Sequence, residues 1–101
     1  MATAYWMTFR IEEDSEHYIR HAQLMDVLRE VCTGAVWSDA GAFVAFESRF
    51  FIDEMALMMK RAIDPTKDFA MISLIAIPAV RLVGNVNQET VARFFPRAQK
   101  V

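Results

Sequence analysis

Residues 64–78 read DPTKD followed by FAMISLIAIP, and this stretch decides the fold of the chain. A residue before proline disfavours the α region, so a helix that precedes this stretch is expected to end at Asp64. Residues 69–77 then form a nine-residue apolar run, interrupted only by Ser73. A strand that is apolar at both alternating sets of positions must be covered on both faces. The stretch therefore predicts a central or near-central strand of a sheet.

Upstream of this strand, the sequence predicts a helix and a β-hairpin. Ser48 is the expected helix cap. The apolar side of this helix consists of Phe51, Ile52, Met55, Met58, Met59, Ala62 and Ile63. Before it, two short apolar runs at residues 35–37 and 42–46 surround the polar turn 38–41, which is typical of a hairpin.

The first third of the chain predicts a strand and an amphipathic helix. Residues 5–11 alternate in strand spacing, and Asp14 or Ser15 can cap a helix that ends near residues 33–34. Its apolar face is expected to hold Tyr18, His21, Ala22, Leu24, Met25, Leu28, Val31 and Cys32. Its polar face is expected to hold Arg20, Gln23, Asp26 and Glu30.

Downstream of Pro78, residues 79–84 predict a short extra strand, and Asn87 is expected to cap a last helix that continues to about Phe95. The element order is then β-α-β-β-α-β with an extra strand and a final helix. This order predicts a ferredoxin-like α+β fold, an antiparallel sheet with two helices on one face. We expect one domain over residues 1–101, with a core at about 4–83 and a C-terminal arm and helix at 84–101.

The second face of this sheet is also apolar, and two helices cannot cover it. An exposed apolar face of this kind marks an interface, so we expect a homodimer. Residues 79–83 are candidates for pairing with the partner's sheet. The alternative is that the C-terminal helix folds back over the open face.

Composition narrows the cellular setting. The chain has 101 residues, 54% of them hydrophobic, and a net charge of −2. A single cysteine, Cys32, excludes an internal disulfide framework and fits a reducing cytoplasm. Neither a signal peptide nor a membrane-spanning run is expected. An acidic chain has no general attraction to nucleic acid, although residues 79–101 carry an excess of basic side chains.

Several features together resemble a known family. They are the element order, an aromatic residue near the end of the first strand, the hairpin residues 37–39 and the Asp-Pro-x-x-Asp turn at 64–68. Over roughly residues 4–83 the chain resembles the small CRISPR-associated spacer-acquisition subunit and the related virulence-associated-protein-D toxins. The resemblance implies a homodimer that exchanges C-terminal strands, and some members cleave RNA or DNA with a metal.

In that family an aspartate closes the first strand, and the pair from two subunits holds the metal. Arg10 occupies the matching position here, and a guanidinium cannot be a ligand of a hard cation. Glu12, Glu13 and Asp14 follow closely, and Asp14 is the one catalytic candidate. Acidic residues just before a helix are more commonly capping and dipole partners.

Two further groups are candidates for binding sites. His17 and His21 are four residues apart, which lets two imidazoles face one metal, but half-buried histidines with hydrogen-bond partners are the common alternative. Arg81, Arg93 and Arg97 are candidates for contacts with nucleic acid, and an ordinary solvated helix is the alternative. The three glycines are scattered, so no phosphate loop or other cofactor motif is expected.

Two functions of different classes follow. The favoured one is a non-catalytic homodimeric scaffold or interaction module, which requires no active site. The other is a metal-dependent nuclease of the toxin or spacer-acquisition type, impaired by Arg10. A small-ligand sensor at a dimer interface is a third possibility.

Overall fold

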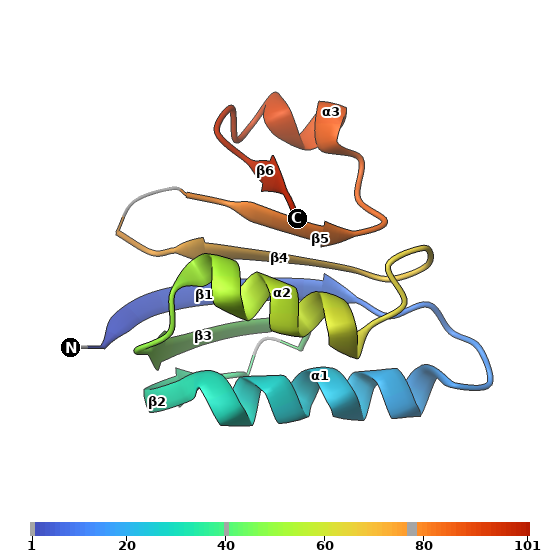
Figure 1. The fold of residues 1–101 in the computed structure, drawn as a ribbon, viewed down its shortest axis with the longest axis horizontal. Coiled ribbons are helices and arrows are strands. Elements are labelled where there is room, and N and C mark those ends of the chain that lie inside the picture. Colours follow the sequence, from blue (N-terminus) through green and yellow to red (C-terminus); the bar gives the residue numbers. More distant parts are fainter. Residues whose placement is uncertain (1, 40, 77–78) are drawn as a thin grey trace.

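A six-stranded sheet in the order β2-β3-β1-β4-β5-β6 forms the centre of the computed structural model, which describes residues 2–39, 41–76 and 79–101 (Figure 1). Helices α1 and α2 lie side by side over one face of this sheet (Figure 1). The elements in chain order are β1 (Thr3–Arg10), α1 (His17–Val31), β2 (Cys32–Trp37), β3 (Phe43–Ser48), α2 (Ile52–Ala62), β4 (Phe69–Leu74), β5 (Arg81–Gly84), α3 (Gln88–Ala92) and β6 (Gln99–Lys100). The predicted α+β class is confirmed.

Strand β1 is central because both of its edges are paired, with β3 on one side and β4 on the other, each antiparallel. Its alternation follows the sequence pattern. Tyr5, Met7 and Phe9 are buried under the helices, whereas Trp6 and Thr8 are half-buried on the opposite face. The predicted hairpin is also confirmed, since β2 pairs antiparallel with β3.

Strand β4 lies between β1 and β5, as its two-sided apolarity predicts. It is shorter than expected, because it ends at Leu74 and Ile75 is already exposed. Ile77 and Pro78, which were predicted to end the strand, lie outside the described residues. Ala70 and Ile72 are fully buried and face the helices through their pairing with the buried positions of β1.

The C-terminal segment departs from the prediction in strand β6 and in helix α3. Strand β5 pairs with β4 of the same chain, whereas the sequence made residues 79–83 candidates for pairing with a partner's sheet, and that pairing stays a prediction. Strand β6 runs parallel to β5, so the sheet is not wholly antiparallel. Helix α3 is capped by Asn87, whose Oδ1 accepts a hydrogen bond from the Thr90 N–H (3.0 Å), but it ends at Ala92. Residues 93–94 form a turn, and Phe95, which precedes Pro96, lies outside the helix although its N–H donates to the Val91 carbonyl oxygen (2.8 Å).

The face of the sheet away from α1 and α2 carries a row of aromatic rings. Ring centroids lie 6.2 Å apart for Trp6 and Phe43, and 6.1 Å apart for Trp37 and Phe43. Phe95 reaches back to Trp6 from the segment after α3, with centroids 6.5 Å apart. Phe95, which lies beyond α3, therefore covers part of this face, while Trp37 stays 51% exposed.

Two predicted helix caps are wrong. Ser48 ends β3, and its Oγ accepts a hydrogen bond from the Phe50 N–H, so α2 begins four residues later at Ile52. Helix α1 begins at His17 without a side-chain cap, because Asp14 caps the preceding turn through the Glu16 N–H. Among the helices described, none has the length and apolarity to cross a membrane.

Candidate functional site

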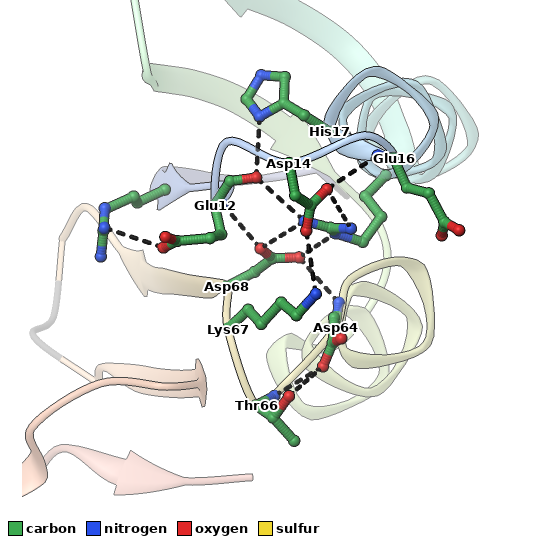
Figure 2. A network of polar contacts seen from close by, with 10 residues as sticks. Glu12, Asp14, Glu16, His17, Asp64, Thr66, Lys67 and Asp68 are labelled. Atoms are coloured by element: carbon green, nitrogen blue, oxygen red, sulfur yellow. Dashed lines mark hydrogen bonds and ion pairs between the residues drawn. The ribbon is translucent and has the colours of Figure 1, made fainter.

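A polar cluster joins the loop after β1 to the turn between α2 and β4, and Asp68 lies at its centre (Figure 2). Asp68 is fully buried. Its carboxylate accepts hydrogen bonds from the backbone N–H groups of Glu12 and Asp64, both at 2.9 Å, and from Nε of Arg20 at 2.8 Å. A buried carboxylate is stable only when its oxygens are partnered in this way. Asp68 therefore ties two connecting segments to helix α1.

Arg20 corrects the sequence prediction for α1. It was assigned to the polar face, yet it is 8% exposed, whereas Tyr18, assigned to the apolar face, is 85% exposed. The physical reason is the number of partners. Besides Asp68, the Arg20 guanidinium donates to the Glu12 carbonyl oxygen (3.1 Å) and to both carboxylate oxygens of Asp14 (3.1 and 3.0 Å). A planar guanidinium with its donors satisfied can be buried.

Asp14, the catalytic candidate, is bound from two sides. It accepts the two hydrogen bonds from Arg20 and one from Nζ of Lys67 at 3.1 Å. The hydrogen bond from Arg20, followed by that from Lys67, holds the pKa of Asp14 well below its ordinary range. In return, the hydrogen bond to Asp14 raises the pKa of Lys67. A carboxylate held in this state is a poor general base near neutral pH, where an efficient base has a pKa close to 7. A catalytic role for Asp14 stays a prediction.

The Asp-Pro-x-x-Asp turn owes its form to Asp64 as well as Asp68. The Asp64 carboxylate accepts hydrogen bonds from the Thr66 N–H (3.0 Å) and Oγ1 (2.6 Å). These bonds, with the side-chain one first, lower the pKa of Asp64. The Asp64 carbonyl oxygen accepts from the N–H groups of Lys67 and Asp68 at 3.0 and 2.8 Å. The turn thus orients the Asp68 carboxylate toward α1.

His17 and His21 lie next to each other near the start of α1, with ring centroids 6.3 Å apart. Both are half-buried. Nδ1 of His17 lies 3.2 Å from the Glu12 carbonyl oxygen, and the ring of His21 packs with its edge against Phe9, centroids 5.7 Å apart. Over residues 2–39, 41–76 and 79–101, no three His, Cys, Asp or Glu side chains are grouped to hold a metal ion. A metal at this pair stays a prediction.

The arginine candidates lie in different surroundings. Arg10, at the position where the resemblance places an acid, is exposed and pairs with Glu12 at 3.1 Å. Arg81 points toward helix α2, where its Nε donates to Oδ1 of Asp53 at 2.6 Å, and its side chain is 16% exposed. Arg93 and Arg97 are exposed in the C-terminal segment. A nucleic-acid role for these residues stays a prediction, and Arg81 would first have to leave Asp53.

Part of this cluster could be recognised from the sequence. The turn at 64–68 was singled out, but as a helix stop rather than as the holder of a buried carboxylate. The partner, Arg20, is 48 residues away from Asp68 along the chain, and helical periodicity placed it on the wrong face.

Comparison of the chain with protein-family models, curated proteins and solved structures gave no match.

Proposed function

We propose that this protein is a non-catalytic interaction module that works as a homodimer. The observation that carries the proposal is the aromatic face of the sheet, where Trp6, Phe43 and Trp37 form a continuous row and half of Trp37 remains accessible. Apolar and aromatic residues gathered on an exposed face are typical of interaction surfaces. A cytoplasmic location is part of the proposal, because the single Cys32 fits a reducing compartment.

The state of the acidic side chains supports an interaction role over catalysis. A metal-dependent nuclease needs clustered carboxylates free to bind cations. Near the end of β1, Asp14 is bound to Arg20 and Lys67, Glu12 is paired with Arg10, and Asp68 is buried against Arg20. To bind a metal, Asp14 or Asp68 would have to give up hydrogen bonds that hold the loops together.

For the architecture, we propose a ferredoxin-like plan over residues 3–74. The neighbour relations β2-β3-β1-β4 and the positions of α1 and α2 in the chain support it, with β5 and β6 as additions at the β4 edge. We also propose that the chain is related to the small CRISPR-associated spacer-acquisition subunit and its toxin relatives. The cis pairing of β5 with β4 differs from the strand exchange that the resemblance implies.

Two measurements test the proposal. Light scattering after size-exclusion chromatography is expected to give twice the mass of the 11.6 kDa chain at micromolar concentrations. When the protein is incubated with labelled RNA and DNA, we expect the same background level of cleavage in Mg²⁺, in Mn²⁺ and in chelator. A monomer at every concentration contradicts the homodimer.

The cleavage assay distinguishes the alternatives through variants. Cleavage that is lost in chelator and in Asp14→Asn, but not in the exposed control Asp26→Asn, would establish the nuclease function instead. A gel shift without cleavage that is weakened by Arg93→Ala and Arg97→Ala would make nucleic acid the partner.

A further inference from the structure

Strand β2 is an open edge of the sheet. In the sheet formed by the described residues, β2 and β6 lie at the two ends, and β6 has only two residues whereas β2 has six (Figure 1). Residues 33–37 of β2 are all exposed, so no helix or loop among the described residues covers them. Unpaired backbone groups along such an edge are a template for another strand.

This edge has neither of the two commonest features by which sheets prevent pairing, a charge or a proline in the strand. Its irregular part lies between Cys32 and Val36, where the register with β3 shifts and the Glu47 carboxylate accepts a hydrogen bond from the Ala35 N–H (2.7 Å), so Val36 and Trp37 are its regular part. Protective edges carry charged side chains, especially lysine, or proline. Residues 32–37 read CTGAVW, without a charge or a proline, and they place Val36 and Trp37 in solvent at 60% and 51% exposure. The edge is therefore suited to bind a strand.

An apolar hollow flanks β2 on each face. On the helix side a hollow of about 330 Å³ has Met25, Leu28, Cys32 and Val44 in its lining. On the opposite side a hollow of about 200 Å³ has Ala35, Trp37, Ala45 and Ile75 in its lining. Because successive side chains of a strand point to opposite faces, Val36 and Trp37 project to different sides of the sheet.

We propose that a second copy of this chain docks here, with its β2 antiparallel to the first β2, so that the two sheets become one continuous sheet. The proposal rests on the homodimer proposed above and assigns its interface. Self-pairing is favoured because an uncharged strand brings no like charges together across the two-fold axis. The apolar residues of each copy then face the hollows beside the other copy's β2. The β4 edge offers no such place, because β5 of the same chain already occupies it.

A charge at the edge is the first test. Val36→Lys adds an ammonium near the two-fold axis in each copy, and we expect the dimer dissociation constant, measured by sedimentation, to rise about tenfold or more. The matched control is Ile19→Lys, a similarly exposed aliphatic residue of α1, which is expected to leave that constant unchanged. If the wild type is a dimer and Val36→Lys does not raise its dissociation constant, the β2 interface is wrong and the homodimer is still supported. A monomeric wild type overturns both.

Cysteine cross-linking tests the antiparallel geometry without changing the fold. In a Cys32→Ala background, a single cysteine replaces Thr33, Ala35 or Val36, and the protein is oxidised. Opposite residues of antiparallel strands lie within disulfide distance only next to the two-fold axis. We expect one position, or two neighbouring ones, to form cross-linked dimers rapidly, and Ile19→Cys to form none. Equal cross-linking at all three positions, or at none, contradicts the proposal.

Discussion

Asp68 holds two connecting segments and a helix together with a single carboxylate. Without it, the Arg20 guanidinium and two backbone N–H groups lose their acceptor in the interior of the protein. Removal of one partner from a buried ion pair lowers stability by about 3–5 kcal/mol, so Asp68→Ala is expected to reduce the free energy of unfolding by that amount. Urea denaturation measures it.

The control for this variant is Asp26→Ala, which removes an exposed ion pair with Arg29. Exposed pairs contribute little, and a change of at most about 1 kcal/mol is expected. If both substitutions lower the free energy of unfolding by the same small amount, Asp68 does not hold the segments together.

Asp14 gives the protein an acid-dependent contribution to stability. Arg20 and Lys67 lower its pKa in the folded state from the ordinary value of 3.8. The unfolded chain therefore takes up a proton at a higher pH than the folded one. The contribution is fully present above the ordinary pKa, and it is lost as the pH falls from there toward the lowered native pKa. We expect Asp14→Asn to destabilise the protein at pH 6 and the difference from wild type to shrink toward pH 2. Urea midpoints across this range measure it, and a constant difference contradicts the linkage.

At the scale of elements, Gly84 fixes how β5 meets the α2–β4 turn. Its φ is +87°, and a Cβ there would collide with the backbone oxygen of Asp68. Gly41 is a matched control, because its φ is +70° and it has open space around it. Gly41→Ala is expected to lower the free energy of unfolding by about 1–2 kcal/mol, and Gly84→Ala by roughly 2–5 kcal/mol. Thermal or urea unfolding compares the two variants. Equal decreases in the free energy of unfolding would show that the protein accommodates the Cβ at residue 84 without additional cost.

The segment after α3 is expected to shield Trp6. In a Trp37→Phe background Trp6 is the only remaining tryptophan of the two in the chain, so its fluorescence reports its surroundings alone. Phe95→Ala removes the ring beside it and should shift the emission to longer wavelength. Phe94→Ala, at a residue 76% exposed, should leave the emission unchanged. An unchanged spectrum in Phe95→Ala would mean that the C-terminal segment does not cover this face.

The sequence predicts those elements whose pattern is local. Period-two alternation identifies β1, a polar turn between two apolar runs identifies the hairpin, and Asn87 identifies the start of α3. Prediction from the sequence fails where a contact with a residue far away along the chain determines burial or pairing. Arg20 is buried only because Asp68 meets it, and β6 has two residues, too few for any periodicity to appear. For the candidate site, the sequence pointed to the acids and the turn, but not to the arginine that binds them.

For the whole molecule, self-association links stability to concentration. If the dimer is more stable than two separate monomers, mass action raises the unfolding temperature as the protein is concentrated. Scanning calorimetry over a hundredfold range of concentration is expected to show this rise in the wild type and a smaller one in Val36→Lys. A transition temperature independent of concentration in both proteins would contradict a dimer coupled to folding.

The central place of β1 has a consequence for biosynthesis. The strand leaves the ribosome before either of its neighbours, since β3 and β4 follow 33 or more residues later. Synthesis proceeds at about 5–20 residues per second, so β1 is present without β4 for a time on the order of seconds. During that time Met7 and Phe9 are solvent-exposed hydrophobic side chains on an incomplete chain. We therefore expect early translational arrest to leave a chain that binds holding chaperones, and arrest after the exit of β4 to release it.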